Sequence, residues 1–184
     1  MPAIEGALPK AVATEVSAQM QRLLADFTGL ARQGQQTHSH VVGPNCESVH
    51  LQLDQLATHA RLLADAVAER AVTLGWAVDC SASATVAQSS LPAFPTGYLD
   101  SHRVVAEIAD RMRLVVQYAR FGLDRLDEID PVTPDLVIGI LEALEKHLWM
   151  LQAQLSRPSL RTGDLPRALR RERRPRRLRP GRRA

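Results

Sequence analysis

Apolar residues recur along four stretches of this chain at alternating spacings of three and four positions. Because an α-helix turns once every 3.6 residues, this spacing places the apolar side chains on one face and the polar side chains on the other. The pattern therefore predicts four long amphipathic helices. Their apolar stripes run from Val12 to Leu30, from Val49 to Val67, from Val104 to Leu126 and from Val137 to Leu155.

Glycine and proline mark the ends of these predicted helices. The first should run to about His38, since the following Gly43-Pro44 pair disfavours helical backbone. We expect Asn45 to be the N-cap of the second helix and Gly75 to stop it. The third should end near Asp130-Pro131, and the fourth should open at Thr133-Pro134-Asp135.

A long connection separates the second and third predicted helices. It covers residues 75–98 and contains the segment SASATVAQSS, which we expect to form a short helix. Aromatic residues make up only 4% of a chain that is 45% hydrophobic, and this composition favours aliphatic helix packing. The sequence thus predicts an all-α fold, a ferritin-like four-helix bundle with a long crossover, rather than an up-down bundle.

Charge is distributed unequally along the 184 residues, although the formal net charge is only +3. Twelve arginines and two acids in residues 157–184 give a net charge of +10, which leaves −7 for residues 1–156. We therefore divide the chain into a flexible arm (1–9), a bundle (10–156) and a disordered basic tail (157–184) whose partner is a polyanion. The tail arginines expected to contact DNA phosphates without reading sequence are Arg167, Arg170, Arg171, Arg173, Arg174, Arg176, Arg177, Arg179, Arg182 and Arg183.

Nothing in the sequence points to a membrane or an oxidising compartment. No apolar run reaches the roughly 18 residues that span a bilayer, and the N-terminus lacks the pattern of a secretory leader. Cys46 and Cys80 lack a metal-binding spacing, so we interpret both as reduced packing residues. We expect a cytoplasmic protein without a membrane partner.

Metal-ligand residue types gather at both ends of the second predicted helix. His38 and His50 lie twelve residues apart, and Asp65 and Glu69 follow further along the helix. At about 1.5 Å of rise per residue, His50 and Asp65 stand roughly 22 Å apart and cannot hold one ion. Ligands from two different chains could hold one ion together.

Four segments of the sequence resemble the Dps family of mini-ferritins. They are HSHVVGPNCESVH, where the family reads HWNVxGPxFxxxH; ADAVAER, where it has a D-x-x-x-E-R run; TVAQSSLP in the long connection; and LEKHLWMLQA in the last helix. The resemblance implies a shell of twelve subunits that oxidises Fe(II) with hydrogen peroxide or dioxygen and stores the ferric mineral. It also implies a nucleoid-associated role, because basic tails bind DNA in some members.

The resemblance further implies where iron binds. The matching ferroxidase ligands are His38 and His50 of one subunit with Asp65 and Glu69 of its two-fold partner, and Asp54 matches a further acid that often contributes. Acids near the start of the last helix line a three-fold pore in relatives, and they match Asp130 and Asp135 here.

Three residues depart from the family pattern. Ser39 replaces a tryptophan beside the iron, His40 replaces an asparagine, and Cys46 replaces a phenylalanine. The loss of the tryptophan keeps an alternative open: a structural, nucleoid-compacting DNA-binding shell with weak or vestigial ferroxidase activity. We assign no function to four other residues that could carry one. Trp149 is expected in the core, and His59, His102 and His147 are expected at the surface or in packing contacts.

Overall fold

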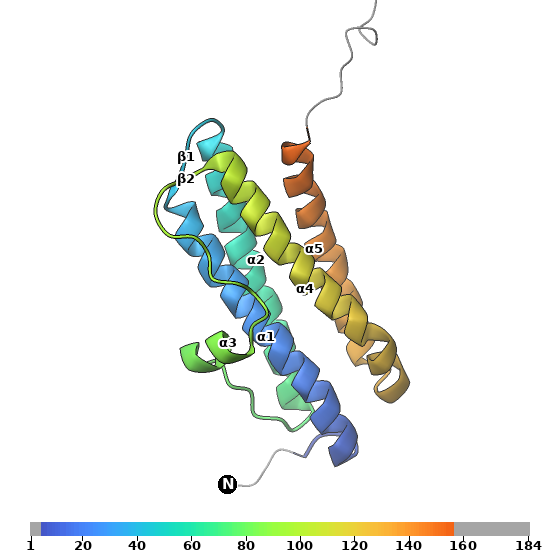
Figure 1. Ribbon diagram of the computed structural model, residues 1–184. Coiled ribbons are helices and arrows are strands. Elements are labelled where there is room, and N and C mark those ends of the chain that lie inside the picture. The colour runs from blue at the N-terminus through green and yellow to red at the C-terminus, as the bar shows by residue number, and fades with distance from the viewer. Residues whose placement is uncertain (1–4, 157–184) are drawn as a thin grey trace, which may run out of the picture.

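The computed structural model describes residues 5–156, and within them the chain is an elongated bundle of helices (Figure 1). The predicted tail and its arginines lie outside the described residues. The elements in chain order are α1 (Lys10–His38), β1 (Val41–Val42), α2 (Cys46–Thr73), α3 (Ala82–Gln88), β2 (Leu99–Asp100), α4 (Ser101–Ile129) and α5 (Thr133–Leu155).

The four long helices form two hairpins, α1 with α2 and α4 with α5, that face each other across a common core (Figure 1). The predicted apolar stripes supply that core, and its largest side chains are under 2% exposed. Among them are Met20, Phe27, Leu53, Ile108, Met112 and Leu144. The all-α bundle predicted from the periodicity is confirmed, as is a short helix in the long connection.

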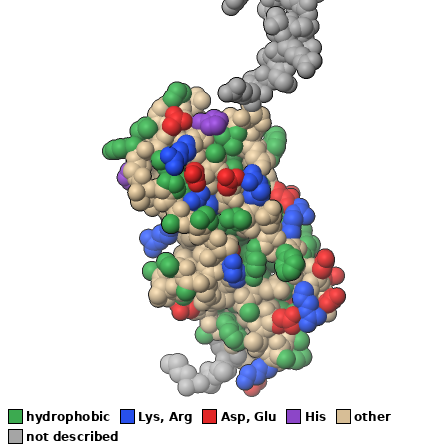
Figure 2. Space-filling view, in the orientation of Figure 1, with side chains coloured by type: hydrophobic (Ala, Val, Ile, Leu, Met, Phe, Trp, Pro, Cys, Tyr) green, Lys and Arg blue, Asp and Glu red, His purple; other side chains and the backbone are tan. Residues whose placement is uncertain are grey.

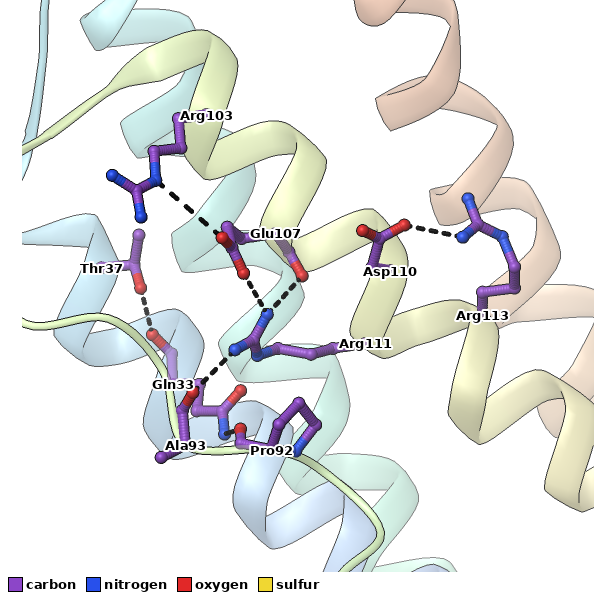
Figure 3. Close-up of polar contacts among 9 residues, drawn as sticks. All are labelled: Gln33, Thr37, Pro92, Ala93, Arg103, Glu107, Asp110, Arg111 and Arg113. Carbon is purple, nitrogen blue, oxygen red and sulfur yellow. Dashed lines mark hydrogen bonds and ion pairs between the residues drawn. The ribbon is translucent and has the colours of Figure 1, made fainter.

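The connection from α2 to α4 is fastened to the bundle by buried charged groups. Asp26 of α1 is fully buried and accepts hydrogen bonds from Ser89 Oγ at 2.8 Å and from the Ser90 backbone N–H at 2.6 Å. On α4, the buried Arg111 donates to the Ala93 carbonyl at 2.9 Å and pairs with Glu107 at 2.7 Å (Figure 3). These bonds fix the segment directly after α3 against α1 and α4.

A small parallel sheet joins the turn between α1 and α2 to the end of the crossover, directly before α4. Val41 pairs with Leu99 and Val42 with Asp100. The next residue, Gly43, has a φ of +92°, and a Cβ at this position would lie 2.7 Å from Asp100 Oδ2. Glycine is therefore required here both by backbone conformation and by space.

The predicted N-cap position of α2 is confirmed, but the side chain of Asn45 does not cap the helix. Asn45 occupies the residue before α2, but its backbone is left-handed, with φ of 62°, and its side chain makes no cap hydrogen bond. A capping side chain needs an extended backbone to reach back over the first turn, which this tight turn does not provide. The predicted stop near Gly75 is confirmed, because Gly75 has φ of +83° directly after the last helical turn.

Three residues expected in the interior are on the surface. Cys46 and Cys80 are exposed, and Trp149 is 65% exposed because it follows Leu148 on α5 and points away from the stripe. Figure 2 shows hydrophobic side chains reaching the surface between intermingled acids and bases. None of the helices within residues 5–156 is both long and apolar enough to span a bilayer.

Candidate metal centre

The two histidines of the predicted iron site lie side by side. His38 is the last residue of α1 and His50 lies on the second turn of α2, so the short turn between the helices brings them together. Their rings stack with centroids 4.0 Å apart and planes inclined by 25°, and both side chains are half-buried. The structure thus places two imidazoles at one end of the α1–α2 hairpin.

A backbone carbonyl fixes the orientation of His50. Its Nδ1 lies 2.9 Å from the carbonyl oxygen of His38, and because a carbonyl can only accept, Nδ1 carries the proton. The lone pair of neutral His50 is then on Nε2, free to bind a metal ion. Metal-binding histidines commonly use such a bond to fix both the tautomer and the ring.

His38 is held less tightly than His50. Its Nδ1 lies 3.2 Å from the hydroxyl of Ser39 and 3.4 Å from the side-chain nitrogen of Gln35. A hydroxyl can donate or accept, so Ser39 is compatible with either tautomer of His38. The residue that replaces the family tryptophan therefore contacts one of the two candidate ligands directly.

Asp65 and Glu69 are far from the histidine pair, whereas Asp54 lies one helical turn after His50. Asp54, Asp65 and Glu69 are all exposed on α2, and the rise of the helix puts Asp65 roughly 22 Å from His50. Within residues 5–156, no three His, Cys, Asp or Glu side chains come close enough to share a metal ion. One subunit thus has the two histidines at one end of α2 and the acids Asp65 and Glu69 towards the other end, so it does not bring the predicted ligands together by itself.

Asp65 faces an open surface formed by α1 and α2. It lines a groove of about 470 Å³ together with Arg32, Gln35 and Arg61. Arg61 donates to Gln35 Oε1 at 2.7 Å and thereby bridges the two helices beside the acid. No salt bridge within the described part of the chain engages Asp65, so its carboxylate is available to a ligand or to another chain.

Asp130, one of the two predicted pore acids, has a structural role in this subunit. It is 1% exposed and accepts a hydrogen bond from Arg70 at 2.7 Å and another from the Thr133 hydroxyl. Burial raises the pKa of Asp130, but the hydrogen bonds from Thr133, Arg70 and the Val132 N–H outweigh it and leave the pKa below its ordinary value. Within one subunit its carboxylate is thus buried and engaged by Arg70, and the pore role of Asp130 stays a prediction.

Asp135, the second predicted pore acid, is exposed in the first turn of α5. Sequence reasoning missed the partner of Asp130. Arg70 ends the ADAVAER segment, and its place in the last turn of α2 gave no signal of a distant partner, because a cation there already suits the helix dipole. The ion pair ties the end of α2 to the turn between α4 and α5.

Comparison with known proteins identifies the family. The ferritin-like domain family matches residues 17–160. The DNA protection during starvation protein of Agrobacterium fabrum is 31% identical over 153 residues, which cover 83% of this chain and 94% of that protein. The chain belongs to the Dps family.

Solved Dps structures have the same fold as this Dps chain. The tetragonal form of Mycobacterium smegmatis Dps superposes with a TM-score of 0.81 at 26% identity, over 86% of this chain and 96% of that one. Dps from Microbacterium arborescens in its high iron form gives a TM-score of 0.79 at 29% identity, over 83% and 99%. The ferritin-like bundle predicted from the long crossover is therefore confirmed.

Proposed function

We propose that this Dps chain oxidises Fe(II) at sites between two-fold related subunits and stores the ferric product inside a closed, twelve-subunit shell. The observation that carries the proposal is the stacked His38–His50 pair, with Nε2 of His50 left free by the carbonyl bond on its other nitrogen. Imidazole with carboxylate suits iron, which is of intermediate hardness. The oxidant is hydrogen peroxide or dioxygen; peroxide takes one electron from each of two Fe(II) ions.

A second subunit would complete each site. The histidine pair lies at the start of α2, and Asp65 and Glu69 lie towards its end. Two α2 helices packed antiparallel across a two-fold axis would bring each histidine end against the acidic end of the partner, forming two identical sites. Asp54, which is exposed and one turn after His50, would contribute a further ligand.

The test of iron chemistry is the rate of peroxide-driven Fe(II) oxidation, followed by ferric absorbance. His50→Ala and Asp65→Ala should each reduce the rate to that of uncatalysed oxidation, whereas His102→Ala, an exposed histidine elsewhere, should not. Equal rates in wild type and in the doubly substituted protein would refute ferroxidase function.

Mixed shells test the location of the site. If His50 and Asp65 of different subunits form one site, a His50→Ala subunit paired with an Asp65→Ala subunit retains one intact site and one doubly damaged site. Random mixing of equal amounts of the two inactive proteins should then restore about a quarter of the wild-type activity. A site contained in one chain predicts no recovery.

We further propose that the tail, residues 157–184, binds DNA phosphates and holds the shell on the nucleoid in the cytoplasm. Several tails on one particle would add avidity to weak individual contacts. A gel shift should show binding that weakens steeply with added salt and disappears when residues 157–184 are removed. Salt-insensitive binding would contradict the phosphate mechanism.

The alternative function is a DNA-binding shell with weak or vestigial ferroxidase activity. The contact between Ser39 and His38 favours it, because a small hydroxyl stands where the family places a large ring against the iron site. This alternative predicts normal DNA binding together with iron oxidation that His50→Ala does not slow.

A further inference from the structure

The seam between the two hairpins contains a second pair of histidines. His59 of α2 and His147 of α5 meet with Nδ1 of His59 3.0 Å from Nε2 of His147. Both side chains are half-buried, and the ring centroids lie 5.2 Å apart with planes inclined by 58°. The two rings come from positions 88 residues apart in the chain.

This pair is separate from the candidate iron ligands. His59 follows His50 by nine residues, which corresponds to about 13 Å along α2 and half a turn around it. The two histidines of α2 therefore point to opposite sides of the helix. Asp65 and Glu69 are likewise not part of any three-ligand group with His59 in the described residues.

The spacing of the two nitrogens suits a shared metal ion. Two imidazole nitrogens bound tetrahedrally at about 2.0–2.1 Å from an ion lie roughly 3.3 Å from each other. The present hydrogen bond is 3.0 Å long, so an ion could replace the shared proton after the rings pivot and separate by a few tenths of an ångström.

Protonation and access also suit metal binding. Burial lowers the pKa of His147, and the neighbouring His59 and Lys146 lower it further, so the ring is neutral at neutral pH. An open groove of about 660 Å³ between α2 and α5 includes Gln55 and Met150, each within one helical turn of one of the two histidines. Neither histidine lines this groove, but both rings are themselves partly exposed, so water and ions can reach the pair.

We propose that His59 and His147 form a second metal site, which binds a late divalent transition-metal ion such as Zn²⁺ through two imidazoles and completes its coordination with water. Imidazole nitrogen selects this class of metal over Mg²⁺ and Ca²⁺, which take oxygen ligands. The coordination shell is open, since no third ligand side chain of the described residues is within reach. The ion would also cross-link the two hairpins.

Zinc counting on the full-length protein tests the proposal. The parent protein carries His38→Ala and His50→Ala, which remove the candidate iron ligands, and is dialysed against Zn²⁺ near pH 7.5. It should retain one zinc ion per subunit at the α2–α5 seam, and adding His59→Ala or His147→Ala should abolish this binding. His102→Ala, an exposed histidine on α4, is the matched control and should leave it unchanged.

Cobalt provides a second measurement that does not depend on stoichiometry alone. Co²⁺ bound to the parent protein should give visible absorption bands that vanish in the His147→Ala protein, and His147→Gln replaces it if alanine prevents folding. Zinc binding that is unchanged by both the His59 and His147 substitutions, or absent from the parent protein, would overturn the proposal.

Discussion

Replacing Asp130 with asparagine should destabilise the subunit, whereas the same change at Asp135 should not. Asp130 forms an ion pair with Arg70, and the two side chains are only 2% and 20% exposed. Breaking one partner of a buried pair typically costs about 3–5 kcal/mol, and the partial exposure of Arg70 favours the lower end, ~3 kcal/mol. Arg70 and Thr133 donate to Oδ2 and the Val132 N–H donates to Oδ1, so asparagine removes the charge and also one of the two acceptor oxygens.

Thermal denaturation at fixed protein concentration measures this effect, because the stability of an oligomer depends on concentration. For a domain of this size, ~3 kcal/mol corresponds to a decrease of roughly 6–12 °C in Tm. Asp135→Asn, which removes an exposed charge, is the control and should leave Tm unchanged.

Lowering the pH should remove the difference in Tm between the wild-type protein and Asp130→Asn. The pKa of Asp130 is below its ordinary value of 3.8 in the folded subunit, so the ion pair stabilises the fold above that pH and its contribution is lost as the pH falls through the folded-state pKa. An unchanged Tm for Asp130→Asn at pH 7, together with slower iron entry, would refute the structural role and support the pore assignment.

Three further changes probe other parts of the fold. The pKa of His147 is lower in the folded subunit than in the unfolded chain, so as the pH falls the unfolded chain binds a proton at this residue before the folded subunit does. The free energy of unfolding should therefore fall as the pH drops below about 6.5. Urea titrations should show a shallower fall for His147→Gln. Gly43→Ala should cost about 1–3 kcal/mol in urea unfolding, because its φ is +92° and the added Cβ meets Asp100; an equal midpoint would contradict this strain. Asp26→Ala should cost ~2 kcal/mol by leaving buried donors unpaired, and limited proteolysis should cut residues 75–98 faster than in wild type.

The sequence by itself determined the helices and the separation of the candidate ligands along α2. Both follow from the fixed 3.6-residue turn and 1.5 Å rise of a helix, which depend only on local spacing. The ends of the helices are also a local property, since Gly75 and Pro131 interrupt the helical pattern whatever the rest of the chain packs against. Four quoted segments were enough to indicate the Dps family.

Tertiary structure decided which side chains meet. The periodicity predicts that Asp130 and Arg70 lie near the ends of different helices. Only the packing of those helices buries the acid and brings it into contact with an arginine 60 residues away in the sequence. Likewise, the hydrogen bond between His59 and His147 depends on how α2 crosses α5, and the exposure of Trp149 depends on which side of α5 faces the core. Local spacing fixes the face of a helix that a residue occupies, whereas the identity of its neighbours depends on how separate helices pack, which no single stretch of sequence contains.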